Sequence, residues 1–380
     1  MKRAGFVCLI FLVIGCVSQR KVANRHQAIS ISGLRLINQF SLPSAMMFKE
    51  TVVGGLSGID YDAKRDLYYM ICDDPSTKGP ARFYTARIPI SDTGIDSVQI
   101  VDMTALLNPQ ARPYTDITKD RIHSADVEAM RYDSKRDELI WSSEGQRYLR
   151  DGKQELQNPS VILMQRDGRY LDSFQLPPIL HIQLEEKGPR HNSVFEAIGI
   201  DETASHVYIG IEEPLYEDGP RAAGGDSSGW VRIVKFNRAL KQSVAQFAYR
   251  IDPVPHPSNP PSAFKINGVS DILCLGNDQF LIIERAWSTG RLPSDVRLYL
   301  ADAKGAQDVT SLSLKTQPPK KPITKKLLLD LNSLGLFIDN MEGVTFGPTL
   351  PNGNRTLLLV ADDNFAKGQR SQFLLFEVVP

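Results

Sequence analysis

Acidic side chains recur along the chain at fixed distances from one another. Glu128 and Glu144 lie 16 positions apart, and Glu196 and Glu212 repeat this spacing. Further acids beside short apolar runs are Asp73, Asp74, Glu284, Glu342 and Asp362. Carboxylate oxygens are preferred ligands of hard cations, and Ca²⁺ best tolerates irregular arrangements of roughly six to eight of them. If the fold gathers these acids, they form a cation site, and Ca²⁺ is the expected ion.

These acids belong to a sequence unit that occurs five times. Each unit opens on an acid or a small polar residue, continues as a strand-like run, passes a polar turn and ends in an apolar run followed by acids. The opening residues are Ser57, Glu128, Glu196, Asn267 and Glu342, separated by 71, 68, 71 and 75 positions. Self-similarity at a steady period indicates a repeat architecture.

Each unit holds about four short segments rich in β-branched and aromatic residues, with turn residues between them. Four strands per repeat, without helices, predict the blades of a β-propeller. The last unit has only three such segments, whereas segment 33–42 has no partner nearby. We therefore predict an all-β propeller of five four-stranded blades that is closed by this N-terminal strand. Six blades are the alternative, which requires further strands within the long loops.

The hairpin geometry predicts where the acids gather. In an antiparallel pair, the start of one strand lies beside the end of the next, so the acids at both places fall on one rim of the ring near its axis. Carboxylates held this close repel one another unless protons or cations neutralise them. The predicted metal ligands are Asp73, Asp74, Glu128, Glu144, Glu196, Glu212, Glu284, Glu342 and Asp362. The alternative is that these acids cap turns and pair with basic loop residues.

Basic residues in the loops of this rim favour an anionic ligand. Those expected to bind substrate are Arg82, Arg190, Lys265, Arg285 and Arg370. Arginine binds phosphate oxygens in a bidentate way, although solvated loop charge explains these residues equally well. His123 and His191 precede Glu128 and Glu196 by five positions. Together with Glu342, these four are the candidate acids and bases of catalysis. For the histidines, a hydrogen bond that orients a neighbour is the alternative.

Charge and motif content exclude several classes of function. The chain has 44 basic and 44 acidic residues and no net charge, which argues against a nucleic acid as partner. It contains no P-loop, H-E-x-x-H or dinucleotide-binding motif, so a nucleotide-dependent enzyme or a zinc protease is not expected. A small anionic ester is the expected ligand, and we expect the chain to be a monomer.

The first residues have the pattern of an export signal. Lys2 and Arg3 precede an apolar run over 4–14 that is too short to span a bilayer as a helix. The run ends in LVIGC (12–16), which resembles a bacterial lipobox. We predict a lipoprotein signal peptide over 1–16 with a lipidated Cys16, a flexible tether over 17–30 and a propeller domain over 31–380. This places the protein at the bacterial cell envelope, anchored in a membrane and facing the periplasm. A plain signal peptide cut near Ser18 is the alternative.

Three stretches resemble a known family. They are GGLSGIDYDAKRDLYYMICDD (54–74), NMEGVTFGP (340–348) and LLLVADDN (357–364), together with the recurrent Glu-Ala or Glu-Gly openings. From about residue 50 to 378 the chain resembles the phytase-like domain family, described by esterase-like activity of phytase. The resemblance implies a β-propeller, an exported protein that is often a lipoprotein, and an ester hydrolase. True β-propeller phytases have six blades and bind several Ca²⁺ ions through an Asp-Ala-Asp-Asp-Pro motif, of which Cys72-Asp73-Asp74-Pro75 keeps only the tail.

Two hypotheses of function follow. The first is an exported hydrolase of phosphate monoesters or other anionic esters, in which bound metal polarises the ester. The second is a non-catalytic, lipid-anchored binding propeller in which Ca²⁺ only stabilises the ring.

Overall fold

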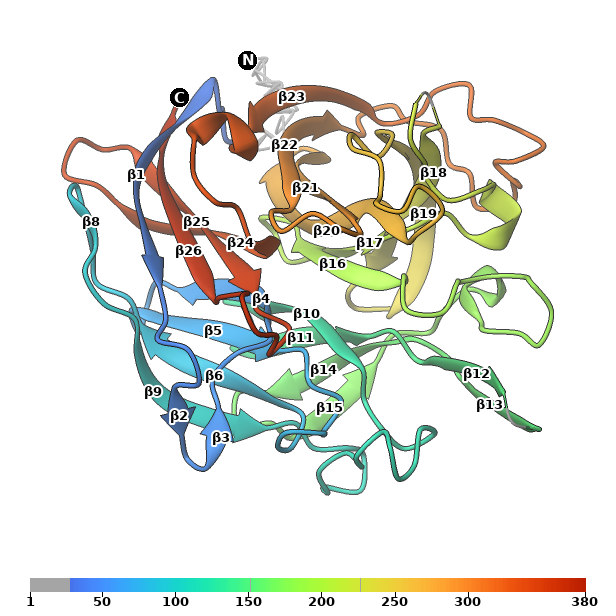
Figure 1. Ribbon diagram of the computed structural model, residues 1–380, viewed down its shortest axis with the longest axis horizontal. Coiled ribbons are helices and arrows are strands. Elements are labelled where there is room, and N and C mark those ends of the chain that lie inside the picture. The colour runs from blue at the N-terminus through green and yellow to red at the C-terminus, as the bar shows by residue number, and fades with distance from the viewer. Residues whose placement is uncertain (1–27, 151, 226) are drawn as a thin grey trace, which may run out of the picture.

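The computed structural model describes residues 28–150, 152–225 and 227–380. Five antiparallel four-stranded sheets surround a common axis as the blades of a propeller (Figure 1). Blade 1 comprises β4 (Leu56–Asp62), β5 (Leu67–Cys72), β6 (Arg82–Arg87) and β9 (Gln99–Ala105). Blade 2 comprises β10 (Val127–Asp133), β11 (Glu138–Ser143), β14 (Ser160–Gln165) and β15 (Tyr170–Ser173). Blade 3 comprises β16 (Phe195–Ile200), β17 (His206–Ile211), β18 (Gly229–Asn237) and β19 (Gln242–Ile251). Blade 4 comprises β20 (Lys265–Gly276), β21 (Gln279–Ser288), β22 (Asp295–Asp302) and β23 (Thr324–Asp330). Blade 5 comprises β24 (Asn340–Thr349), β25 (Arg355–Asp362), β26 (Gln372–Val379) and β1 (Gly33–Ser41).

Short elements decorate the connections between these strands. The small hairpins are β2 (Met47–Phe48) with β3 (Thr51–Val52), β7 (Ile90–Ser91) with β8 (Gly94–Ile95), and β12 (Gln146–Arg150) with β13 (Lys153–Gln157). The helical elements of the described residues are single 3₁₀ turns at Pro178–Leu180, Tyr216–Asp218 and Leu331–Leu334. The long loops of each repeat therefore add little regular structure to the ring.

Strand β1 completes the last blade and closes the ring. It pairs antiparallel with β26, from Gly33 opposite Val379 to Ser41 opposite Gln372, and the two strands lie side by side in Figure 1. Closure removes an unpaired strand edge, which would otherwise be open to pairing with other chains. The predicted five four-stranded blades and their closure by the N-terminal strand are confirmed, and the six-blade alternative is wrong.

Close packing near the axis makes the centre of the ring narrow. Apolar side chains fill the space between neighbouring blades, such as Ile71, Met130 and Trp141 between blades 1 and 2. Closer to the axis, only small residues fit between the inner strands. A Cβ added at Gly343 of blade 5 would lie 3.0 Å from the Cα of Gly58 in blade 1. Glycine at these two positions lets the backbones of β4 and β24 approach each other.

A buried ion pair fills this narrow centre. Arg131 of β10 donates to the carboxylate of Asp271 in β20 at 2.6 Å, and the side chains are 3% and 1% exposed. The same guanidinium donates to the backbone oxygens of Ile59 in blade 1 and Ile272 in blade 4. Asp271 in turn accepts from the backbone N–H of Val344 in blade 5. Four of the five blades are thus connected through one ion pair.

Some predicted segments lie outside the described residues. The signal peptide over 1–16, the lipidated Cys16 and the tether up to residue 27 belong to this part of the chain. The last residues of the predicted tether contact the propeller, because the backbone N–H of Ile29 donates to the oxygen of Leu275 in blade 4. Within the described ranges, no helix has the length and apolar character that crossing a membrane requires.

Replacing Arg131 by methionine is expected to destabilise the whole ring, since it leaves the Asp271 carboxylate buried without its cation. Removing one partner of a buried ion pair typically costs about 3–5 kcal/mol. Urea unfolding should therefore show a lower midpoint with an unchanged m-value. The exposed Arg87→Met serves as the matched control. Adding Asp271→Asn to Arg131→Met should recover part of the loss, and a double variant no more stable than the single one would contradict this explanation.

Candidate functional site

The innermost strand of every blade is interrupted by a β-bulge at the same rim of the ring. The bulges fall at Ser57, Glu128, Glu196, Ser270 and Glu342. A bulge leaves one residue out of the ladder and re-aims its side chain. The three glutamates at bulges consequently line one cavity. This is the local reason why acids that open each repeat converge on one place.

The fourth repeat opens at Ser270, so the predicted opening at Asn267 is wrong by three positions. The Asn267 amide donates to the backbone oxygen of Asp252 and to the Glu284 carboxylate. Glu284 also accepts from Lys325, is 2% exposed and does not line this cavity, so the structure does not bring it together with the other predicted metal ligands. Successive side chains of a strand point to opposite faces, and Arg285, the next residue, lines the cavity instead.

Acids at the ends of the second strands complete the site. Asp73, Glu144 and Glu212 directly follow β5, β11 and β17, and Asp362 is the last residue of β25. These positions agree with the expectation that starts and ends of the hairpin strands lie together. Asp126 joins them and was missed, because no other repeat has an acid two positions before its opening residue. The only signal in the sequence was that Asp126 lies two positions before Glu128, and residues two positions apart in an extended segment point to the same face.

Two groups of three carboxylates have the proximity that a metal ion needs. Asp73, Asp126 and Glu128 form the first triad, and Glu128, Glu144 and Glu196 form the second. Within each triad, the candidate ligand atoms all lie within 4.8 Å of one another. Because Glu128 belongs to both, the two triads form one continuous cluster.

The triad carboxylates have few partners among the described residues. Those of Asp73 and Glu128 make no hydrogen bond or ion pair within the described ranges. Glu144 shares a hydrogen bond with the Glu196 carboxyl, and it accepts from the backbone N–H of Val194 through Oε1. Its Oε2 is buried without a partner. Buried acceptors are ordinarily satisfied, so this oxygen indicates that a proton or a cation belongs here.

Burial and mutual repulsion raise the pKa of the triad carboxyls. The pKa lies well above the ordinary carboxyl range for Asp73, Glu128, Glu144 and Glu196. Burial raises the pKa of Asp126 to about 6, although its hydrogen bond from Gln146 acts in the opposite direction. The charged forms are disfavoured because they are removed from water and face other acids.

One arginine lies beside the triads. Arg285 donates to Glu342 at 2.9 Å and to Glu212 at 3.2 Å, and its Nε is buried without a partner. Burial lowers the pKa of Arg285, but the surrounding carboxylates outweigh burial and raise it. Burial raises the pKa of Glu212 to about 8, even though Arg285 lowers it. This single guanidinium is therefore already shared between two acids outside the triads.

A cavity of about 540 Å³ lies at the rim of the ring where these acids gather, which we call the acid rim. Its lining acids are Asp73, Glu128, Glu196, Glu212 and Glu342. Its cations are Arg285, Arg291 and Lys367, and its apolar side includes Phe264 and Trp287. A larger hollow of about 820 Å³, lined by Asp102, Asp137 and other residues of blades 1 and 2, contains none of these acids.

Two residues predicted for this site pair with each other elsewhere. Asp74 and Arg82 form an ion pair of 2.7 Å and are 1% and 0% exposed. Asp74 also accepts from the backbone N–H groups of Thr77 and Lys78, and Arg82 donates to the hydroxyl of Tyr84. The structure therefore does not bring Asp74 together with the other predicted metal ligands, nor Arg82 with the cavity. Asp74 is a turn cap, as the alternative reading proposed for single acids.

Neither predicted histidine is placed for acid–base chemistry in the cavity. His123 contacts Asp120, and its side chain is 72% exposed. Local burial and the nearby Arg150 and Arg147 lower the pKa of His191. Neither ring lines the cavity. Their equal spacing from Glu128 and Glu196 reflects the repeat and not a shared chemical role.

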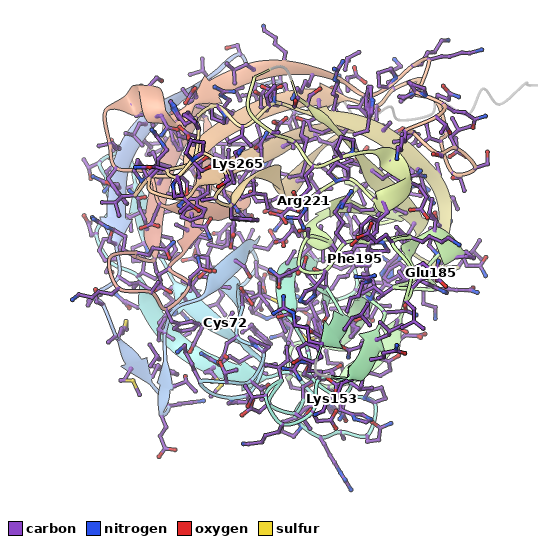
Figure 2. All side chains as sticks on the ribbon, turned by 45° about the vertical axis from the view of Figure 1, so that its right-hand side comes forward. Cys72, Lys153, Glu185, Phe195, Arg221 and Lys265 are labelled. Carbon is purple, nitrogen blue, oxygen red and sulfur yellow. The ribbon has the colours of Figure 1, made fainter. Side chains whose placement is uncertain are left out.

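Three predicted substrate-binding residues also lie outside the cavity. Arg190 stacks on Tyr216, Arg370 stacks on Phe337, and Lys265 donates to the backbone oxygen of Pro261. Figure 2 shows Lys265 on the blade 4 side of the ring and Arg221 on the blade 3 side. Of the five predicted basic residues, only Arg285 lines the cavity, where Arg291 and Lys367 accompany it.

Segment 225–229 matches the G-x-S-x-G pattern of serine hydrolases. In a nucleophile elbow, this serine stands on a sharp turn between a strand and a helix. Here Ser227 is followed by strand β18 and not by a helix. Ser227 does not line the cavity, so this serine is separate from the acids gathered there.

Comparison with known structures shows propellers of low overall similarity. An exo-β-1,3-galactanase from Phanerochaete chrysosporium is 12% identical with a TM-score of 0.46, covering 90% of this chain and 64% of that one. A GH43 β-1,3-galactosidase is 11% identical with a TM-score of 0.46, covering 89% and 95%. The periplasmic gluconolactonase of Pseudomonas aeruginosa is 11% identical with a TM-score of 0.38, covering 92% and 100%. At this level of similarity, the neighbours carry no argument about activity.

Sequence comparison is more specific. No curated protein matches the chain by sequence. A family model described as phytase-like, esterase-like activity of phytase, matches residues 51–365. That range contains all five bulges and every acid of the two triads. The protein belongs to the phytase-like family.

Proposed function

We propose that this propeller is a metal-dependent hydrolase of anionic esters, with phosphate monoesters as its main substrate class. The observation that carries the proposal is that three acids of the carboxylate triads and three cationic side chains line one cavity. The acids are Asp73, Glu128 and Glu196, and the cations are Arg285, Arg291 and Lys367. Acids alone would repel an anionic ester. Cations alone would bind the ester without activating it. In combination, the acids would hold a metal ion and the cationic side chains would bind the anionic group of the ester.

The triads fit Ca²⁺ by the chemistry of their donors. Each offers three carboxylates whose candidate ligand atoms lie within 4.8 Å of one another, and Oε2 of Glu144 is a buried oxygen without a partner. A hard cation satisfies such a set of oxygens and neutralises the repulsion among them. When bound, Ca²⁺ supplies polarisation of the ester and a water of lowered pKa.

The remaining work falls to the chain's own side chains. Glu342 lies outside both triads, where the amide of Asn340 and the guanidinium of Arg285 each donate to it at 2.9 Å. Burial raises its pKa, although Arg285 lowers it. A raised pKa brings a carboxyl closer to the pH at which it exchanges protons efficiently. We therefore assign Glu342 as the acid or base at the ester, in preference to Glu128 and Glu196, which belong to the triads.

A non-catalytic binding propeller is the second candidate. The observation that favours it is the ion pair of Arg285 with Glu212 and Glu342, because a guanidinium that already has two partners also serves as a structural link. In this case Ca²⁺ would stabilise the ring without turning over a substrate. Stability and activity measurements separate the two candidates.

Glu128→Gln is expected to abolish stabilisation by Ca²⁺, because Glu128 is the one acid shared by both triads. Binding to the folded state alone stabilises by about 2.7 kcal/mol when the free ion exceeds Kd a hundredfold. Thermal unfolding with Ca²⁺ and with a chelator measures this increment. Glu155→Gln, an acid outside both triads, should keep it. An unchanged increment in Glu128→Gln would place the ion elsewhere.

In a chelator, the stability of the wild type is expected to decrease between about pH 4 and pH 8. The triad acids have folded-state pKa values above their unfolded ones, so the folded state binds more protons and loses stability as they dissociate. The window begins at the unfolded carboxyl pKa of about 4 and extends to the folded-state pKa values, about 6 for Asp126 and about 8 for the neighbouring Glu212. Glu128→Gln should show a shallower decrease, and a steeper one would contradict the assigned repulsion.

The wild type is expected to hydrolyse an aryl phosphate in the presence of Ca²⁺ and to lose this activity in a chelator. Arg285→Gln should lower kcat/KM by roughly 100-fold, as expected for the loss of one donor to developing charge. Arg370→Gln is the control, since Arg370 stacks on Phe337 outside the cavity. An aryl acetate tests whether carboxylic esters are also substrates. Stabilisation by Ca²⁺ without hydrolysis of either ester would establish the binding propeller.

We also propose that the chain is exported and held at the membrane by a lipid on Cys16, as a monomer that faces the periplasm. The support is the LVIGC run after a short apolar segment. Cys16→Ser should release the protein from the membrane fraction, because acyl chains are what hold an otherwise soluble propeller there. Immunoblots of the fractions measure this, with Cys8→Ser as control, and unchanged partition of Cys16→Ser would contradict the anchor.

A further inference from the structure

The first hairpin of blade 4 extends further over the acid rim than those of the other blades. Strand β20 begins at Lys265, five positions before its bulge at Ser270, whereas β16 begins at Phe195, one position before the bulge at Glu196. At about 3.3 Å per residue, the four additional positions make the first hairpin of blade 4 extend roughly 13 Å further beyond its bulge than that of blade 3. The backbone and hydroxyl of Thr289 both donate to the oxygen of Phe264, which ties the two ends of the extension together.

The extension carries aromatic side chains on the face that borders the cavity. Ile266 pairs with Trp287, and Gly268 pairs with Arg285. Opposed residues two positions apart along each strand share a face, so these four residues lie on the same face of the hairpin. The rings of Phe264 and Trp287 lie 6.2 Å apart at 38°. Phe264 is 53% exposed, and Leu292 beside it on the cavity lining is 84% exposed. We call Phe264 and Trp287 the aromatic wall, beside which the exposed Leu292 also lines the cavity.

Among the residues that the structure describes, no packing contact covers Phe264 or Leu292, which stay exposed. Large apolar side chains next to polar groups at a cavity mark a place where a ligand removes them from water. The other side chains that line the cavity are almost all acidic, basic or amide groups. The wall therefore gives the cavity one apolar side and one charged floor.

The register of β21 also fixes how far the wall lies from the charged groups. Trp287 follows Arg285 by two positions on the same face, which corresponds to about 7 Å along the strand. Arg285 contacts Glu342 at 2.9 Å. A flat group stacked on Trp287 therefore has its neighbouring substituent beside Arg285 and the acids.

We propose that the aromatic wall is the subsite for the non-reacting part of the substrate, and that this part is a ring with a flat apolar face. The ring stacks on Trp287 and Phe264 while its ester group lies at Arg285. Both aryl rings and pyranose rings have such a face, and short alkyl groups do not. This inference rests on the proposed function only for the anionic group at Arg285.

Binding measurements by calorimetry, with Ca²⁺ present, test the subsite independently of turnover. Phenyl phosphate and glucose 1-phosphate are the ring-bearing probes, and ethyl phosphate is the probe without a ring. The wild type should bind at least one ring-bearing probe more tightly than ethyl phosphate. Trp287→Ala should weaken that probe about 3–10-fold, the factor that one aromatic contact supports. Binding of ethyl phosphate should stay unchanged, and Trp287→Phe should restore most of the loss.

Trp230→Ala is the matched control, because Trp230 contacts Arg250 in blade 3 and does not line the cavity. Which ring-bearing probe binds decides between an aryl and a pyranose ring. Equal binding of all three probes, equal losses for all in Trp287→Ala, or no binding of either ring-bearing probe would overturn the aromatic subsite. A preference for a ring without hydrolysis of phenyl phosphate would support the subsite and contradict the proposed function.

Discussion

The ion pair between Arg131 and Asp271 is the contact on which the geometry of the ring depends. Arg131 and Asp271 are 3% and 1% exposed, and charges buried in this way need partners. Arg131 donates to the carboxylate of Asp271 and to three backbone oxygens, and Asp271 also accepts from an N–H of blade 5. Burial raises the pKa of Asp271 to about 6, although Arg131 lowers it. Four blades, two of whose inner strands also carry acids of the rim, are thereby connected to one another.

The affinity of the acid rim for protons and cations depends on the fixed distances between its carboxylates. In a flexible loop, carboxylates that repel one another move apart. Here they project from bulges in strands that are paired on one side and packed against neighbouring blades, so they stay within ligand distance of each other. The cost appears as raised pKa values in the triads and as the buried, unpaired oxygen of Glu144. Such stored repulsion is relieved when a proton or cation binds, which is how a rigid scaffold creates affinity for an ion.

Function in this propeller arises where the repeats differ from one another. Blades 2, 3 and 5 place a glutamate at the bulge, whereas blades 1 and 4 place a serine whose hydroxyl donates to the backbone of the next blade. Blade 4 adds Arg285 and the aromatic wall on its longer hairpin. A symmetric ring of five acids would bind cations only. Because blade 4 contributes a cation and an apolar surface in place of an acid, the two sides of the cavity differ. In the proposed binding mode, the ester group lies at one side and the ring at the other.

The sequence by itself determined the number of blades, the closing strand and most acids of the rim, because each of these depends on a local pattern that the repeat copies. It did not determine which of two neighbouring side chains faces the cavity. Glu284 and Arg285 differ by one position, and a shift of one position in a strand exchanges the two faces of the sheet. The bulge at Ser270 and the longer hairpin of blade 4 set this register, and neither interrupts the apolar pattern of the sequence. The partners of Asp74, Arg82, His123 and Arg190 were likewise decided by the tertiary structure, since loop side chains pair with whatever the fold brings within reach.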